Sequence, residues 1–156
     1  MKNLYRYKIY YTLKGGTIFQ AIKTQNPEYL KEILLRNYQE HGEIILKLTY
    51  SLNDSEIKVL VDVLLQLDFI EYLFLEDTLP SNNGAILLSQ LLKQKKNIKE
   101  FKLSGPRINT VGAKAIAESL IDNTNIEKFE LSNTNFGDEG AIAFSEILNK
   151  IGRAHV

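Results

Sequence analysis

Apolar residues recur with a fixed period through the second half of this 156-residue chain. Ile70, Ile98 and Ile126 stand 28 residues apart, and each opens a six-residue segment in which inward and outward positions alternate. Alternation with a period of two is typical of a β-strand with one buried face. The pattern therefore predicts three strands, at residues 70–75, 98–103 and 126–131.

A second pattern follows each of these segments. After a stretch rich in Asn, Pro, Gly and Ser, the apolar spacing changes to three and four residues, as in the buried stripe of an amphipathic helix. The three predicted stripes contain Gly84, Ala85, Leu88, Leu91 and Leu92, then Gly112, Ala113, Ile116 and Leu120, then Gly140, Ala141, Phe144, Ile147 and Leu148. The small residues at each helix start predict a close approach between neighbouring helices and turns.

A weaker copy of the same unit precedes the three clear ones. With a shift of 27 residues, its matching apolar positions are Leu46, Leu48, Val61 and Leu65. Asn53 or Asp54 supplies the cap of its predicted helix. We therefore expect about four tandem units over residues 43–150, and we interpret residues 151–156 as a tail or a cloning scar.

Tandem strand–helix units of this length imply an α/β solenoid. Each unit is too small to bury its apolar side alone, so neighbouring units stack and share one core. A strand, a helix and then an equivalent strand imply a parallel sheet with helices on one face, because such crossovers are right-handed almost without exception.

The repeated unit resembles a leucine-rich repeat, in particular the ribonuclease-inhibitor-like subclass with a strand and a full helix in each unit. The pattern of that family, L-x-x-L-x-L-x-x-N-x-L followed by G-x-x-x-L-x-x-x-L, is matched in the third clear unit by Ile126, Phe129, Leu131, Gly140, Phe144 and Leu148. The resemblance implies a short right-handed solenoid with the parallel sheet on its concave face and the helices on its convex face. The family's buried asparagine is replaced by Ser51, Thr78, Pro106 and Thr134. Threonine can make part of its hydrogen bonds and proline none.

The first 42 residues have a different pattern. Residues 5–13 and 17–23 resemble two strands on either side of Lys14-Gly15-Gly16, which predicts a β-hairpin around the two glycines. Asn26-Pro27 then predicts the start of a helix. We interpret residues 1–42 as a hairpin and helix that cap the open core of the solenoid. The alternative is a separate mini-domain, although so few residues bury little core of their own.

Composition limits the classes of partner and the location. Nineteen Lys and Arg balance nineteen Asp and Glu, so no net charge attracts nucleic acid or anionic lipid. The absence of cysteine excludes disulfides and thiolate metal sites, and it fits a reducing compartment. No segment has the apolar core of a signal peptide, and none approaches the roughly 20 apolar residues that span a bilayer. We expect a cytoplasmic protein, or a secreted effector in a host cytosol, with neither nucleic acid nor a membrane as partner.

The sequence contains no recognisable catalytic or metal-binding set. His41 and His155 lie outside the repeat strands, and neither has metal-ligand spacing to carboxylates. The adjacent acids of Glu76-Asp77 and of Asp138-Glu139 diverge, as sequence neighbours usually do. Lys14-Gly15-Gly16 lacks the length of a phosphate-binding loop. We therefore expect no enzyme activity, no cofactor, no metal and no small-molecule substrate.

The outward-facing strand residues are the candidates for binding a protein partner, because the concave face of a solenoid commonly binds macromolecules. The predicted binding residues are Lys47, Tyr72, Phe74, Glu76, Glu100, Lys102, Lys128 and Glu130. Glu100 is expected beside Lys128, and the next pair likewise has opposite charges. Mutual neutralisation of a solvated sheet is therefore the simpler interpretation of the charges.

Tyr72 and Phe74 stand out because neighbouring repeats carry charged or small polar residues at most of the corresponding outward positions. Exposed aromatic residues in one patch mark interaction sites, and they often dominate binding energy. The alternative is that the N-terminal hairpin or another chain covers them.

Two hypotheses for the function follow. The first is a non-enzymatic protein-interaction module that binds through the concave face. For it, the resemblance implies either a bacterial effector inside a host cell or a eukaryotic scaffold that caps actin filaments or regulates small GTPases. Abundant Ile, Asn and Lys suggest an AT-rich genome and favour the effector. The second hypothesis is the substrate-targeting repeat region of a larger enzyme.

Overall fold

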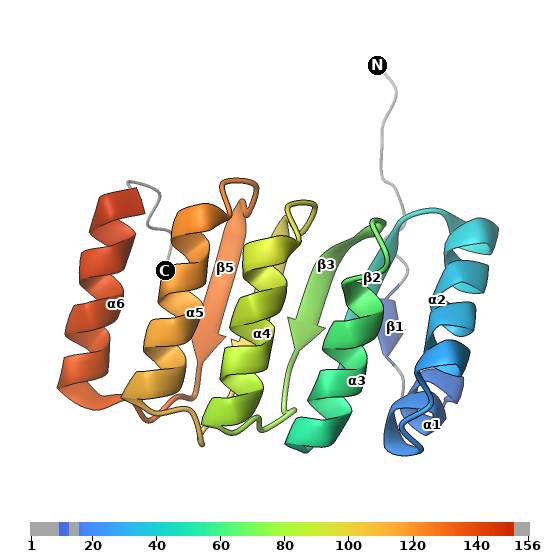
Figure 1. The fold of residues 1–156 in the computed structure, drawn as a ribbon, viewed down its shortest axis with the longest axis horizontal. Helices are drawn as coiled ribbons and strands as arrows, with labels where there is room; N and C mark the ends of the chain where they lie inside the picture. The colour runs from blue at the N-terminus through green and yellow to red at the C-terminus, as the bar shows by residue number, and fades with distance from the viewer. Residues whose placement is uncertain (1–9, 13–15, 152–156) are drawn as a thin grey trace.

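Strands and helices alternate along the protein and stand side by side in one row (Figure 1). The computed structural model describes residues 10–12 and 16–151. In these residues the elements are β1 (Tyr10–Thr12), α1 (Thr17–Lys23), α2 (Pro27–His41), β2 (Ile44–Leu48), α3 (Asp54–Leu64), β3 (Ile70–Leu75), α4 (Asn82–Gln94), β4 (Glu100–Ser104), α5 (Thr110–Asp122), β5 (Lys128–Ser132) and α6 (Gly137–Ile151). The order confirms the predicted tandem strand–helix units.

The strands form one parallel sheet whose spatial order follows the chain. The hydrogen-bonded neighbours are β1 and β2, β2 and β3, β3 and β4, and β4 and β5. The register places Tyr72 beside Glu100 and Glu100 beside Lys128, so corresponding positions of successive units are neighbours. The helices cover one face of the sheet (Figure 1). The protein is therefore a βα solenoid of the α/β class, as predicted.

The predicted N-terminal hairpin is wrong. Residues Thr17–Lys23, expected as its second strand, form helix α1, and β1 pairs in parallel with β2. The segment fits two patterns, because it follows two glycines that suit a hairpin turn and also has Ile18, Ala21 and Ile22 at helical spacing. A helix places these three side chains on one face, and all three are buried in the core. Burial of that face decides between the two patterns.

The first unit differs from the others because two helices follow its strand. Helix α2 begins where the Asn26 side chain accepts a hydrogen bond from the Tyr29 N–H at 3.0 Å, as the sequence predicts. Leu30 and Leu34 of α2 belong to the same buried cluster as the later repeats. The other residues of the predicted hairpin, and residues 152–156 of the predicted tail, lie outside the described residues.

The apolar positions of the repeats form the core between sheet and helices. The register neighbours on the helix side are Leu46, Leu73, Phe101 and Phe129 in one row and Leu48, Leu75, Leu103 and Leu131 in the next. Phe101 is fully buried and stacks on Phe129, with ring centroids 5.8 Å apart. Phe129 and Leu131 of β5 are only half-buried. The last unit therefore contributes less buried apolar surface than the middle units.

Glycines begin the helices where neighbouring units approach each other. Gly84 and Gly112 are 28 residues apart and buried at the starts of α4 and α5. A Cβ on Gly112 would lie 2.6 Å from Asn82 Oδ1 and 3.1 Å from Ala85 Cβ. Asn82 Oδ1 accepts hydrogen bonds from the backbone N–H groups of Asn109, at 2.9 Å, and Gly112, at 3.2 Å. The predicted close approach at these small residues is confirmed.

We expect Gly112→Ala to lower the free energy of unfolding by about 1–3 kcal/mol, because the added methyl group displaces the Asn82 side chain from two N–H donors. Denaturant unfolding followed by circular dichroism measures the change. Val111→Ala, at a neighbouring position that is 60% exposed, is the control, with an expected change below about 0.5 kcal/mol. Wild-type stability in the Gly112 variant would contradict this account of the helix start.

Asparagine side chains join each unit to the preceding one at the edge where the strands begin. The Asn97 side-chain amide donates a hydrogen bond to the Ile70 carbonyl at 3.1 Å, and the Asn125 amide donates to the Lys96 carbonyl. These asparagines are 28 residues apart, and each immediately precedes one of the repeated isoleucines. The repeat therefore has an asparagine ladder before the strand.

The turn after β3 uses threonine where the resembling family has asparagine. The Thr78 hydroxyl is buried and lies 3.4 Å from the Leu75 carbonyl, which is a long hydrogen bond. The Thr78 carbonyl accepts from the Leu52 N–H of the preceding unit at 2.9 Å. Thr78 therefore makes part of the hydrogen bonds that an asparagine would make at this position, as predicted.

Candidate interaction surface

The face of the sheet opposite the helices carries the predicted partner-binding residues. One row of register neighbours contains Ile45, Tyr72, Glu100 and Lys128, and the next contains Lys47, Phe74, Lys102 and Glu130. We call these residues, together with Glu76, the strand face. The predicted arrangement of neighbours on this face is confirmed, and their role in binding stays a prediction.

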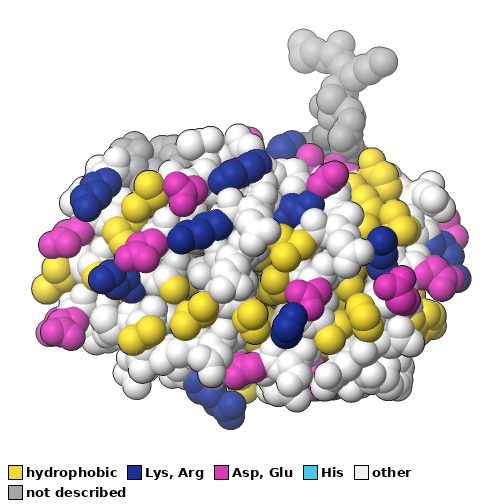
Figure 2. All heavy atoms as spheres, in the orientation of Figure 1, with side chains coloured by type: hydrophobic (Ala, Val, Ile, Leu, Met, Phe, Trp, Pro, Cys, Tyr) yellow, Lys and Arg dark blue, Asp and Glu magenta, His cyan; other side chains and the backbone are white. Residues whose placement is uncertain are grey.

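Opposite charges lie close together on the strand face. Lys102 Nζ is 3.7 Å from Glu130 Oε2 on the adjacent strand, and Lys47 Nζ is 2.9 Å from Glu76 Oε2. These side chains are partly exposed, so each pair contributes only about 0–1 kcal/mol to stability. Positive and negative side chains are also interspersed on the helix side, as Figure 2 shows. The surface therefore has local charge patterns without a field of one sign.

Phe74 is buried, so the prediction of an exposed Phe74 on this face is wrong. Its exposed fraction is 7%. Lys47 and Lys102 are its register neighbours on either side, and Lys102 Nζ lies 4.9 Å from the ring centroid. Lysine stems cover apolar surface while their ammonium groups stay hydrated, and an ammonium over a ring gains about 0.5–1 kcal/mol. Phe74 is therefore a support for Lys102 rather than an open contact.

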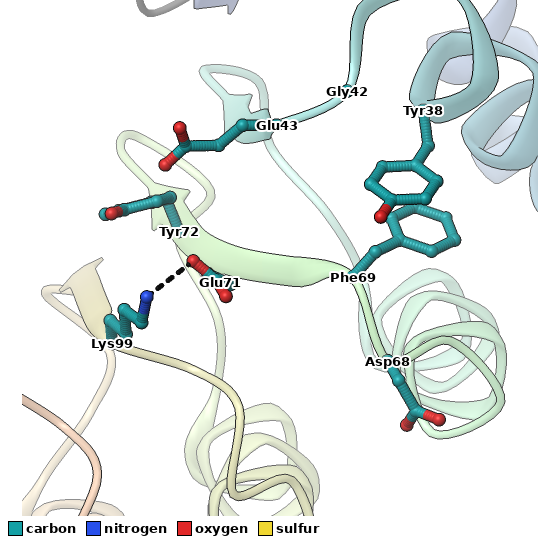
Figure 3. Close-up of a pocket in the computed structure, with 8 residues that line it drawn as sticks. All are labelled: Tyr38, Gly42, Glu43, Asp68, Phe69, Glu71, Tyr72 and Lys99. Carbon is teal, nitrogen blue, oxygen red and sulfur yellow. Dashed lines mark ion pairs between the residues drawn. The ribbon is translucent and has the colours of Figure 1, made fainter. Parts of the chain in front are cut away.

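Tyr72 is half-buried beside Glu43 and the Glu71–Lys99 ion pair at the edge where the strands begin (Figure 3). Burial, a hydrogen bond to the Glu43 carboxylate and the charge of Glu43 raise the pKa of Tyr72 above its ordinary value. The phenol is therefore neutral at physiological pH and donates to Glu43. Lys99 Nζ lies 2.9 Å from Glu71 Oε2, and this contact raises the pKa of Lys99. Tyr72 thus belongs to a polar cluster as well as to the strand face.

A hollow of about 660 Å³, here called the edge pocket, lies beside Tyr72 (Figure 3). Its lining residues are Tyr38, Gly42, Glu43, Asp68, Phe69, Glu71, Tyr72 and Lys99. Tyr38 of α2 stacks on Phe69, with ring centroids 4.2 Å apart and ring planes at 10°. The stacked rings lie on one side of the hollow, and Glu43 and Tyr72 lie on the other (Figure 3). The pocket therefore combines an aromatic wall with several carboxylates.

The edge pocket was not predicted from the sequence. Of its lining residues only Tyr72 was among the predicted binding residues, and most of the others come from the segments that precede β2, β3 and β4. One signal for it exists. Phe69 stands immediately before Ile70, where the next two units have the ladder asparagines Asn97 and Asn125. An aromatic residue at the position that precedes the repeated isoleucine is therefore the sequence signal for the edge pocket.

No catalytic or metal-binding role is predicted for either histidine. His41 is the last residue of α2, with Nε2 3.6 Å from Glu40 Oε2, and His155 lies outside the described residues. Within residues 10–12 and 16–151, no group of three or more His, Cys, Asp or Glu side chains is arranged to hold a metal ion. None of the helices found in those residues has the length and hydropathy to cross a bilayer.

Comparisons with known proteins agree with this geometry. A family model described as Leucine Rich repeat matches residues 122–145, which extend from the end of α5 through β5 into α6. The βα solenoid fold is consistent with a leucine-rich repeat. Its sequence matches no curated protein.

Among solved structures, this βα solenoid is similar to actin-binding site 2 of leiomodin-1. The TM-score is 0.60, and the match covers 84% of this chain and 70% of that chain. The sequence identity is 16%, so the similarity shows a common fold.

Proposed function

We propose that the protein is a non-enzymatic interaction module that binds another protein through its strand face. The observation that carries the proposal is the register, which aligns the side chains of β2 to β5 that face away from the helices into two rows on one sheet. Ile45 and Phe74 of these rows are buried, and the other side chains are at least partly exposed. Because the core between sheet and helices uses the helix-side positions, the exposed positions of the strand face can vary for recognition. We place the chain in the ribonuclease-inhibitor-like subclass, because its repeat strands are followed by full helices of 11 to 15 residues.

The charges of the strand face support a protein as the partner. Between β4 and β5 the register neighbours have opposite charges in both rows, Glu100 beside Lys128 and Lys102 beside Glu130, and the chain as a whole has no net charge. A nucleic acid would require a surface of one sign. Alternating charges instead match a protein surface with the complementary pattern, and they favour specificity and orientation more than affinity.

The similar solved structure suggests which protein to test first. It is described as an actin-binding site, so actin filaments are the first candidate partner. The setting that we propose is the cytosol, either of the producing cell or of a host cell that receives the protein as an effector. The lack of cysteine in the sequence is consistent with that reducing compartment.

Charge reversal on the strand face tests the proposal. We expect Lys102→Glu to weaken partner binding by about tenfold or more, because it places two acids beside each other at the centre of the face. Binding is measured by co-sedimentation with actin filaments and, for other proteins, by quantitative capture from cell lysate. Lys114→Glu is the matched control, since Lys114 pairs with Glu118 of the same helix at 4.0 Å on the opposite side of the protein.

A double variant separates recognition from stability. Lys102→Glu combined with Glu130→Lys keeps an ion pair between β4 and β5 but reverses its direction on the surface. We expect this variant to lose at most about 1 kcal/mol of unfolding free energy, from the lost ammonium over Phe74, and still to bind its partner weakly. If Lys102→Glu and Lys114→Glu retain the same partners with the same affinity, binding through the strand face is wrong.

A further inference from the structure

We propose that the edge pocket receives an arginine side chain of the partner protein. This inference rests on the proposed function, because it assumes a protein partner. It concerns a surface next to the strand face, formed where β2, β3 and β4 begin. The residues of that surface differ from those of the strand face, apart from Tyr72.

The aromatic wall of the edge pocket is the first argument. Tyr38 is 41% exposed, and no other aromatic side chain among residues 16–150 is as open to solvent. Stacking on Phe69 fixes the orientation of the Tyr38 ring beside the hollow. A rigid, open aromatic face is a surface on which a guanidinium group stacks, and it attracts cations.

The carboxylates of the pocket are the second argument. The lining contains three acids, Glu43, Asp68 and Glu71, against one cation, Lys99. Asp68 points away from Glu43 and Tyr72 (Figure 3), so Glu43 and Glu71 are the carboxylates available inside the hollow. Two of the acids already have a lysine partner, since Lys99 lies 2.9 Å from Glu71 and Lys95 lies 2.6 Å from Asp68. The carboxylates still offer further lone pairs, because each oxygen accepts more than one hydrogen bond.

The pattern of donors and acceptors favours arginine over other ligands. A guanidinium group has five N–H donors in one plane, so it can stack on Tyr38 while it donates to carboxylates at the pocket rim. A phosphate or an acidic peptide would be repelled by the excess of carboxylates, and an apolar ligand would leave them without water. Glu43 also raises the pKa of Tyr72, which agrees with a negative potential at this position.

The surroundings of the pocket indicate that the arginine belongs to a chain rather than to a free amino acid. Glu71 and Lys99 also line a second hollow along the same edge, together with Lys96, Asn97, Thr124, Asn125 and Glu127. The two hollows therefore share a wall. A partner segment with its arginine in the edge pocket has room to continue along the starts of β4 and β5, where side-chain amides and both signs of charge can bind its backbone.

A peptide titration tests the inference. The probe is the tripeptide acetyl-Gly-Arg-Gly-amide, added to the isotope-labelled chain and followed by NMR chemical shifts of backbone amides. We expect a dissociation constant of about 1 mM or weaker, with the largest shifts at Glu43, Phe69 and Tyr72. The same peptide with citrulline, which is neutral and similar in shape, is expected to bind about tenfold more weakly.

A matched pair of variants locates the site. Tyr38→Leu keeps an apolar side chain but removes the ring, so we expect about a fivefold loss of affinity for the arginine peptide. Tyr29→Leu changes another tyrosine of α2 outside the edge pocket and is expected to leave the affinity unchanged. Circular dichroism confirms that each variant is folded.

The outcomes decide between this inference and the proposed function. The inference is overturned by equal binding of the citrulline peptide, by shifts outside the edge pocket, by unchanged affinity in Tyr38→Leu, or by no binding up to about 20 mM peptide. Lys102→Glu is expected to keep the peptide affinity. Loss of partner binding in Lys102→Glu alone therefore tests the strand face, and loss of peptide binding in Tyr38→Leu alone tests the edge pocket.

Discussion

Replacing Phe74 by alanine is expected to lower the free energy of unfolding by about 3 kcal/mol, although Phe74 lies on the side of the sheet away from the helices. Its ring is 7% exposed and lies beneath the Lys102 ammonium at 4.9 Å. Truncation leaves a cavity and removes the surface on which the lysine stem rests. Urea unfolding followed by circular dichroism measures the change.

The control for Phe74 is its neighbour Tyr72, which is half-buried and points to the same side of the sheet. Tyr72→Ala is expected to cost about 1 kcal/mol, mainly through its hydrogen bond to Glu43. If Phe74→Ala is as stable as the wild type, the burial of the ring is wrong and Phe74 is again a candidate for direct contact with the partner. If Phe74→Ala is destabilised as expected, weaker partner binding by this variant reflects its lower stability rather than a lost contact.

The repeat period predicted most of the fold because one pattern determined three levels of structure. The 28-residue spacing of Ile70, Ile98 and Ile126 located successive strands, their parallel pairing and their register. Register follows from the period because every unit must place the same positions in a shared core. The neighbours on the strand face were predictable for the same reason.

The N-terminal unit was predicted less well because the period does not extend to it. Residues Thr17–Lys23 follow two glycines that suit a hairpin turn and also contain apolar side chains at helix spacing, so the local pattern fits two structures. The choice depends on Ile18, Ala21 and Ile22 meeting the core of the repeats, which is a contact between distant parts of the chain. Local periodicity has no information about that contact.

The edge pocket and the burial of Phe74 were not predictable from alternation. Alternation tells which side of a sheet a residue faces, whereas burial depends on the neighbouring side chains, here Lys102 over the Phe74 ring. The pocket unites residues of α2, β3 and the segments between helices and strands, and the Tyr38–Phe69 stack joins residues from two units. A structure was needed to bring them together.

Replacing Asn123 by alanine is expected to lower the free energy of unfolding by about 2–4 kcal/mol. Asn123 is fully buried after α5, and its side-chain amide donates to the carbonyls of Leu92 and Lys95, both at 2.9 Å. Its Oδ1 accepts from the Asn125 N–H at 3.1 Å. Alanine leaves these carbonyls without a donor in a place that water does not reach. The free energy of unfolding therefore falls by the full cost of burying two carbonyl groups without hydrogen bonds.

Asn125→Ala is the matched control, because Asn125 is exposed and its amide donates to the Lys96 carbonyl of the same preceding unit. Water can replace that bond, so the expected cost is below about 1 kcal/mol.

Amide hydrogen exchange shows which part of the chain is destabilised by the substitution. In Asn123→Ala we expect faster exchange in β5 and α6 than in α2 and β2, because the lost bonds attach the end of α5, which leads into β5, to the end of α4. Uniformly faster exchange would mean that the repeats unfold as one cooperative block. Equal stability of the Asn123→Ala and Asn125→Ala variants would contradict a role of the buried Asn123 hydrogen bonds in joining the units.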